Sequence, residues 1–169
     1  MLRSTDQVVN LSEIEPQTTE WLWPGRIPLG ELTILDGDPS CNKSSVTLDL
    51  AARVSTGQEM PDRTPGVAGS VLLLLAEDSL EKTIIQRLRA AGANLDNIST
   101  FREDVMLPDH LGRLEAAIAH TRSRLVIIDP LMAFLSCDVN GDQKVRRALG
   151  PLKRIADQAN CAVIMVRHL

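Results

Sequence analysis

The sequence predicts an α/β fold in which helices flank a mostly parallel central sheet in three layers. Short apolar runs typical of strands alternate with longer amphipathic segments from Trp21 onward. Two of these runs, 71–75 and 125–128, are continuously apolar, which is typical of strands buried on both faces. Because strands that alternate with helices favour a parallel sheet covered on both sides, we expect one three-layer domain.

Each element follows from its hydrophobic pattern and its flanking residues. A polar lead-in at 1–20, rich in Thr, Glu and Gln, is expected to pack poorly, and the domain is expected to occupy 21–169. Gly57 and Gly92 are expected to end two of the helices. The expected strands are 32–35, 71–76, 98–101, 125–128 and 162–166, and the expected helices are 46–54, 80–91, 111–120 and 145–160.

Length and composition exclude several classes of protein. The 169 residues suffice for one domain, and a hydrophobic content of 44% excludes a wholly disordered chain. The longest apolar run, 71–76, is far shorter than the roughly 20 residues of a membrane span. Polar residues within the first ten positions interrupt any secretory signal. We therefore expect a soluble, cytoplasmic protein with no membrane partner.

Charge and residue usage narrow the expected ligands. The 18 Lys and Arg against 22 Asp and Glu give a net charge of −4, which does not indicate nucleic-acid binding by bulk charge, although local basic patches stay compatible with it. Three cysteines without paired spacing argue against a disulfide scaffold or a zinc site. Aromatic residues make up 2% of the chain, so a base-stacking platform is not expected.

A loop that matches the P-loop at all but one position follows the first strand of the expected sheet. The P-loop pattern is Gly, four residues, then Gly-Lys-Ser/Thr between a strand and a helix. Backbone N–H groups of such a loop cradle phosphate oxygens at the helix N-terminus. Lys43 would neutralise β- and γ-phosphate charge, and Ser44 would bind Mg²⁺. The expected nucleotide-contacting residues are Gly37, Asp38, Pro39, Ser40, Cys41, Asn42, Lys43, Ser44 and Ser45.

Asn42 stands where the P-loop pattern has its second glycine. Asn is among the few residues besides Gly that adopt left-handed backbone conformations, at a cost of about 1 kcal/mol. The loop shape and nucleotide binding are therefore expected to survive, whereas a side chain beside the phosphates would crowd them and slow hydrolysis. An alternative interpretation of the loop is an ordinary polar turn with a surface lysine. For Cys41, a separate question stays open: its thiol is either a redox switch or a small residue that the loop tolerates.

Acidic and histidine residues follow other strands at the same edge of the expected sheet. Glu77 is placed to orient and activate a water, while Asp78 or Ser79 caps the helix that follows. Asp129 ends an apolar strand in the Walker B manner and would hold Mg²⁺. His168 follows the last strand, where it would either sense the γ-phosphate or be an ordinary exposed histidine.

Taken together, the motifs resemble the RecA-like AAA-family ATPases of the RepA type, which include plasmid hexameric replicative helicases. The resemblance covers 21–169 and rests on 21–30, 35–39, 76–78, 86–93, 126–130 and 166–168. It implies Mg²⁺-dependent binding and hydrolysis of ATP, with single-stranded DNA as a partner in a hexameric assembly that serves replication or repair. The residues matched to family roles are Lys43 for phosphate, Ser44 and Asp129 for Mg²⁺, Glu77 as the catalytic glutamate, His168 as the sensor and Arg87 as a nucleotide-site arginine.

Some positions depart from the family pattern or have a second interpretation. Arg87 is alternatively an exposed helix arginine paired with Glu81 or Asp96. Besides Asn42, positions 40 and 41 hold Ser-Cys where the family often has Gly-Leu. The family continues beyond the sensor strand with a DNA-facing loop, further strands and an arginine finger, so we expect a chain truncated at Leu169. Such a chain would bind ATP but hydrolyse it weakly, or be a non-catalytic module or a non-functional fragment.

Overall fold

Five parallel strands form the central sheet of this protein in the computed structural model, which describes residues 9–38, 41–136 and 141–168. Every neighbouring pair of strands in the sheet is parallel. The α/β fold expected from the sequence is therefore confirmed. In spatial order the strands are β3 (Leu32–Gly37), β7 (Ala162–His168), β6 (Ser123–Asp129), β4 (Ser70–Leu75) and β5 (Ile98–Thr100).

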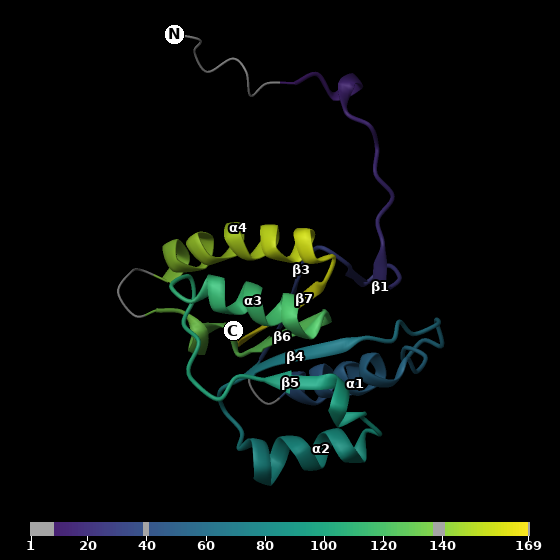
Figure 1. The fold of residues 1–169 in the computed structure, drawn as a ribbon, viewed down its shortest axis with the longest axis vertical. Helices are drawn as coiled ribbons and strands as arrows, with labels where there is room; N and C mark the ends of the chain where they lie inside the picture. The colour runs from purple at the N-terminus through teal and green to yellow at the C-terminus, as the bar shows by residue number, and fades with distance from the viewer. Residues whose placement is uncertain (1–8, 39–40, 137–140, 169) are drawn as a thin grey trace.

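Helices cover both faces of the sheet, as Figure 1 shows. α1 (Lys43–Thr56) and α2 (Ile85–Ala90) lie on one face, and α3 (Leu111–Thr121) and α4 (Gly141–Ala159) lie on the other. In the described part of the chain, no helix is long and apolar enough to cross a membrane.

Strand β6 supplies apolar side chains to both faces. Leu125 and Ile127 belong to a cluster with residues of α1 and α2, whereas Val126 and Ile128 belong to a cluster with residues of α3 and α4. All four are fully buried. Because alternate side chains of a strand point to opposite faces, this arrangement accounts for the continuous apolar run in the sequence.

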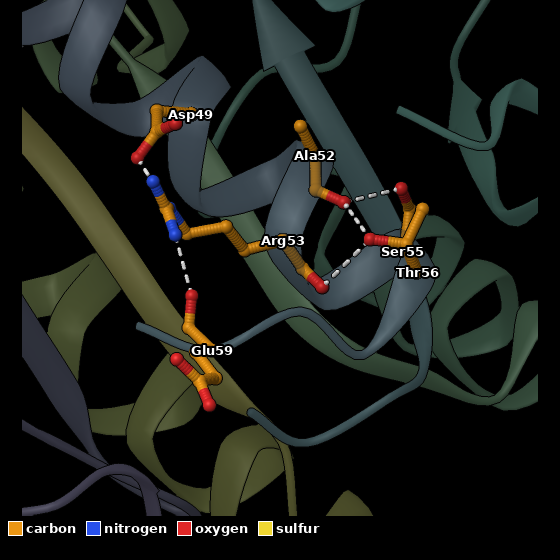
Figure 2. A network of polar contacts seen from close by, with 6 residues as sticks. All are labelled: Asp49, Ala52, Arg53, Ser55, Thr56 and Glu59. Atoms are coloured by element: carbon orange, nitrogen blue, oxygen red, sulfur yellow. Dashed lines mark hydrogen bonds and ion pairs between the residues drawn. The ribbon is translucent and has the colours of Figure 1, made fainter. Parts of the chain in front are cut away.

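Helix α1 ends at its C-terminus in a set of local hydrogen bonds (Figure 2). Arg53 bonds the carboxylate of Asp49 at 2.7 Å and also donates to the backbone oxygen of Glu59. The hydroxyls of Ser55 and Thr56 both donate to the oxygen of Ala52. Residue 57 is the predicted glycine, at φ +74°, and its N–H donates to the oxygen of residue 53, so the expected helix stop is confirmed.

The segment predicted as one helix at 80–91 has two parts. A π-helical turn, η2 (Leu80–Ile84), precedes α2. The backbone N–H groups of Thr83 and Ile84 both donate to the oxygen of Ser79, and this double bonding widens the first turn. The hydroxyl of Ser79 accepts from the N–H of Lys82 at 3.2 Å. Of the two capping residues considered, Ser79 is thus the cap.

A hairpin that the sequence analysis did not anticipate precedes the sheet. It consists of β1 (Trp21–Trp23) and β2 (Ile27–Pro28), and it is anchored by the buried side chains of Leu22 and Ile27. The indole N–H of Trp23 donates to Asp62 at 2.9 Å. The shorter elements are the 3₁₀ turns η1 (Leu11–Glu13), η3 (Leu95–Asn97) and η4 (Leu131–Phe134).

Residues 9–20 form what we call the N-terminal arm. Apart from η1 it has no helix or strand, and its residues are exposed. Its first part runs away from the body of the molecule in Figure 1, whereas 17–20 line a cavity together with Asp157 of α4.

Candidate nucleotide-binding site

The sequence-predicted site residues meet at one edge of the sheet. Because the strands are parallel, their carboxyl ends share that edge, where ligands bind in open α/β folds. Gly37 at the end of β3 is the register partner of His168 on β7. Leu75 at the end of β4 is the partner of Asp129 on β6, and the N–H of Ala76 donates to the oxygen of Asp129 at 3.2 Å.

The loop between β3 and α1 turns into the helix through Asn42. This residue has φ 56° and ψ 28°, the left-handed conformation expected where the P-loop pattern has glycine. Its backbone oxygen accepts the N–H of Val46 at 3.1 Å, so the first helical bond is made. Its side chain is exposed and makes no capping bond. Pro39 and Ser40, also expected to contact nucleotide, lie outside the described residues.

Lys43 is the first residue of α1 and is only 6% exposed. Its ammonium donates to the backbone oxygens of Gly37 at 2.7 Å and Asp38 at 2.6 Å. These bonds draw the lysine across the loop and fold its side chain back over it. An ammonium has three donors, so two bonds to the loop leave it able to serve a further acceptor.

Ser44 lies beside the acidic end of β6. The hydroxyl of Thr47, one turn further along α1, donates to the oxygen of Ser44 at 3.0 Å and contacts Asp129 at 3.4 Å. Asp129 is 4% exposed. Ser44, Glu77 and Asp129 line one small cleft together with apolar side chains of α1 and β4. The residues predicted to bind Mg²⁺ and the predicted catalytic glutamate therefore come together.

A cavity of about 280 Å³ opens next to this cleft. Its walls come from the N-terminus of α1, from the residues after β4 and from α2. The exposed side chain of Glu77 lines it together with the first residues of α1. The lining residues are Cys41, Asn42, Lys43, Ser44, Ser45, Glu77, Asp78 and Arg87.

Arg87 lies in this cavity and is paired with Asp78 at 3.1 Å. The pairing with Glu81 or Asp96 considered for an ordinary surface arginine is wrong. Asp78 lies three residues after the end of β4 and two residues before the π-helical turn, and its carboxylate meets the arginine of α2. Sequence reasoning missed this pair because Asp78 was considered only as a helix cap.

A second ion pair joins the ends of β3 and β7. Arg167 bonds Asp36 through two guanidinium nitrogens, one of them at 3.2 Å from the carboxylate. This hydrogen bonding holds the pKa of Asp36 below its ordinary value. The neighbouring His168 is placed by its backbone beside Gly37, and its side chain lies outside what the structure describes.

A cavity of about 310 Å³ lies at the amino ends of β3 and β7, between the arm and α4, and is unsuited to a nucleotide. Three carboxylates line it, from Glu20, Glu31 and Asp157, and they would repel phosphate. Lys153 at its margin is bound to Glu31 at 2.7 Å.

The site consists of the end of strand β3, the loop that the side chain of Lys43 crosses, and helix α1, which begins beside the acidic end of β6. This arrangement defines a P-loop nucleotide-binding core. The chain belongs to the AAA domain family, whose model matches residues 2–169. Members of this family are typically ATPases, and the family implies nucleotide binding, with Mg²⁺ as the usual companion.

The chain is also similar to DNA repair proteins. It is 25% identical over 160 residues to the DNA repair protein RadA of Listeria monocytogenes, covering 91% of this chain and 31% of that protein. It is 24% identical to RadA of Bacillus subtilis and 28% identical to RadA of Halalkalibacterium halodurans, covering 86% of this chain and 29% of each relative. The chain thus spans about a third of the length of these curated relatives. Since they are repair proteins, assignment to the RepA type stays a prediction.

Proposed function

We propose that this chain binds Mg·ATP in the cavity at the carboxyl edge of its sheet and hydrolyses it slowly, as the ATPase core of an assembly that works on DNA. The observation that carries the proposal is the convergence of Lys43, Ser44, Glu77 and Arg87 on one cavity, with Asp129 in the adjoining cleft. Similarity to proteins named for DNA repair supports the DNA-directed part.

The phosphates would lie against the loop and the N-terminus of α1. The first N–H groups of a helix lack intrahelical partners, and the helix dipole adds positive potential there. Lys43 already faces the loop interior, so its ammonium needs little rearrangement to meet a phosphate oxygen. Arg87 would reach the same phosphates after exchanging its bond with Asp78.

Ser44 and Asp129 would hold the magnesium ion. Mg²⁺ takes oxygen ligands, and in nucleotide sites it uses one or two protein groups together with waters and phosphate oxygens. A hydroxyl and a buried carboxylate at one cleft fit that requirement. Within the described residues there is no group of three or more His, Cys, Asp or Glu that could hold a metal by itself. When bound, the ion neutralises charge on the β- and γ-phosphates.

Glu77 would orient the attacking water, and His168 would sense the γ-phosphate. A carboxylate acts on water only within hydrogen-bond reach, and Glu77 lines the same cavity as the N-terminus of α1. His168 ends the strand beside Gly37, where the loop begins.

The test is titration of Mg·ATP into the parent, Lys43→Ala and Glu77→Gln, with turnover measured in parallel. Lys43→Ala is expected to lose binding by at least about tenfold, because it removes a charge-assisted bond. Glu77→Gln is expected to bind normally and to lose turnover. Lys82→Ala, which removes an exposed lysine outside the cavity, is the matched control. Equal ATP affinity of Lys43→Ala and the parent would show that the loop is not the phosphate site.

A non-catalytic nucleotide-binding module is the second candidate, and Asn42 favours it. Its left-handed backbone keeps the loop shape, but its exposed side chain lies on the cavity where glycine would leave room. Asn42→Gly is then expected to raise ATP affinity or turnover. If both stay at the parent's level, Asn42 is not what limits the site.

We further propose that the core acts in a homo-oligomer of the RepA type with single-stranded DNA as its partner. The support is the resemblance of the motifs together with the family membership. Binding of a labelled single strand, with and without ATP, tests the DNA part directly.

A further inference from the structure

We propose that the side chain of Ile84 is a movable wall between the cleft proposed for Mg²⁺ and an apolar cavity behind it, and that Ile84 shifts into this cavity when Mg·ATP binds. An apolar group that fills the cavity would then oppose Mg·ATP binding. The proposal rests on the proposed function, because it concerns how the cleft between Ser44 and Asp129 admits the ion.

Ile84 lies between two hollows of the molecule. On one side it lines the cleft that also contains Ser44, Glu77 and Asp129. On the other side it lines a cavity of about 240 Å³. Among the described residues that line the cleft, Ile84 alone also lines this cavity. Since its side chain is only 3% exposed, it separates the two spaces from within the core.

The cleft is too narrow for a hydrated ion as it stands. Its volume is about 10 Å³, whereas a single water needs roughly 10–15 Å³. Mg²⁺ in nucleotide sites keeps several waters in its coordination shell. Asp129 lines this cleft and not the larger nucleotide cavity next to it, so an ion held by Asp129 extends into the cleft. A wall of the cleft therefore has to give way.

The other apolar walls of the cleft are held more firmly than Ile84. Leu48 is 2% exposed in the middle of α1 and belongs to the core cluster that this helix forms with the sheet. Leu75 ends β4, and the ladder between β4 and β6 pairs it with Asp129. Ile84 instead ends the short turn η2 and has the 240 Å³ cavity behind it. It is therefore the wall that yields most readily.

The backbone of η2 combines two hydrogen-bonding registers at this residue. The oxygen of Ser79 accepts the N–H of Thr83 at 3.0 Å, as in an α-helix, and the N–H of Ile84 at 3.1 Å, as in a π-helix. The N–H of Ile85 donates to the oxygen of Leu80, which again lies five residues back. Because one acceptor already serves both registers, the turn can adjust at Ile84 with little loss of hydrogen bonding.

The cavity behind Ile84 suits an aliphatic side chain. Its walls are mostly leucine and isoleucine side chains from η2, α2, η3, β4 and β5, with Leu73 and Leu88 buried and Leu95 and Ile98 partly exposed. A cavity of roughly 150 Å³ already admits benzene, so there is room here for part of an isoleucine. Ile84 would exchange one apolar environment for another.

Occupation of the cavity and binding of Mg·ATP should therefore oppose each other. Two ligands that favour different positions of one element are coupled, and each lowers the affinity for the other by the same factor. Lys43 lines the nucleotide cavity and not the cleft. Binding of ATP without Mg²⁺, which depends on Lys43 and the loop, should thus be insensitive to the position of Ile84.

The first test fills the cavity by substitution. Ile98→Phe enlarges a side chain of β5 that lines the cavity, and circular dichroism checks that it folds; Leu95→Phe serves if it does not. The variant is expected to lower the affinity for Mg²⁺ in the presence of ATP at least about fivefold, within the usual range of coupling between sites. Its affinity for ATP without Mg²⁺ should equal that of the parent. Calorimetric titration measures both.

Ile34→Phe is the matched control for this test. It makes the same substitution at an exposed position of β3, the strand at the other edge of the sheet. It is expected to bind Mg²⁺ and ATP like the parent.

The second test shortens the wall itself. Ile84→Ala removes the group that has to move, so Ile98→Phe should lose most of its effect on Mg²⁺ affinity in that background. Ile84→Val serves if Ile84→Ala does not fold. Additive effects of the two substitutions would show that the residues act separately.

The third test uses fluorobenzene as an apolar probe, observed by ¹⁹F NMR. The probe is expected to bind the parent, to be released by Mg·ATP and to stay bound with ATP alone. Ile98→Phe is expected to lose the probe, because the larger side chain takes up its space.

Three results would overturn the proposal. One is a folded Ile98→Phe variant that binds Mg²⁺ with ATP like the parent. Another is additivity of the effects at Ile84 and Ile98. The third is a probe that fails to bind the parent or stays bound at saturating Mg·ATP. Each of these leaves the proposed function intact, whereas equal ATP binding by the parent and Lys43→Ala would overturn that function and this proposal with it.

Discussion

Thr47 on α1 and Asp129 at the end of β6 are 82 positions apart in the sequence and are joined by a buried contact of 3.4 Å. The hydroxyl of Thr47 also bonds the oxygen of Ser44, so one side chain links the helix that carries the phosphate loop to the acidic strand end. The separation between Ser44 and Asp129 therefore depends on a residue outside the P-loop pattern.

Thr47→Val is expected to lower the free energy of unfolding by about 1–2 kcal/mol, because a buried hydroxyl that makes two contacts is replaced by a methyl group. It should also weaken the Mg²⁺ dependence of ATP binding. Urea unfolding and titrations with and without Mg²⁺ measure the two effects. Thr56→Val, at the exposed end of the same helix, should change neither by a comparable amount. Equal effects of both substitutions would contradict the linking role of Thr47.

The bond between Asp36 and Arg167 predicts a dependence of stability on pH. Because the hydrogen bonding of Arg167 lowers the pKa of Asp36 in the folded protein, the stabilisation is present above the unfolded-state pKa, about 4. It is lost as the pH falls through the lower folded-state pKa. The parent should therefore lose its advantage in unfolding free energy over Asp36→Asn as the pH falls below about 5, because protonation of the carboxylate is linked to unfolding.

Asp109→Asn, at an exposed position two residues before α3, is the control for that experiment. The ion pair does not stabilise the fold if the parent and Asp36→Asn differ in unfolding free energy by the same amount at neutral and at acid pH.

The two cysteines in the described part of the chain should react very differently with an alkylating reagent. Cys161 is fully buried, and burial raises the pKa of its thiol to about 11, so roughly one molecule in ten thousand carries the thiolate at neutral pH. Cys41 is exposed and lines the proposed ATP cavity. Mass spectrometry after brief treatment with iodoacetamide should find Cys41 modified and Cys161 intact.

Mg·ATP should then protect Cys41. At a concentration about 100 times its dissociation constant, the nucleotide occupies about 99% of the sites. The rate of Cys41 modification should therefore fall to about 1% of its value without nucleotide. Unchanged modification of Cys41 while ATP is bound would place the nucleotide elsewhere.

Arg87→Ala and Asp78→Asn should show whether the ion pair of these two residues contributes to the stability of the fold or to ATP binding. Because both side chains are substantially exposed, neither substitution should change the unfolding free energy by more than about 0.5 kcal/mol. Arg87→Ala should weaken ATP binding about tenfold through loss of a charge-assisted bond, whereas Asp78→Asn, which frees the arginine, should not. Arg89→Ala on the same helix is the control. An ATP affinity unaffected by Arg87→Ala would leave the arginine as a surface residue.

Most of the sheet could be predicted from the sequence because each buried strand is a continuous apolar run with its own flanking turn. The expected strands at 71–76 and 125–128 agree with β4 and β6 to within a few residues. The left-handed conformation of Asn42 could also be predicted, since few other residues tolerate it.

The polar contacts of the site could not be predicted in the same way. The pair of Asp36 and Arg167 joins residues 131 positions apart and depends on the register of β3 against β7. Local pattern carries no information about that register. The π-helical turn was missed for a related reason, because its apolar spacing also fits a regular helix. Thr47 carried a usable signal, since it lies one helical turn after Ser44.

The alternation of side chains along β6 has a thermodynamic consequence. One strand contributes to the packing on both sides of the sheet, so neither half of the molecule can melt while the other stays intact. Differential scanning calorimetry should therefore record a single endotherm whose calorimetric and van't Hoff enthalpies agree. Ile127→Ala and Ile128→Ala, which open space on opposite faces, should shift that one peak rather than split it.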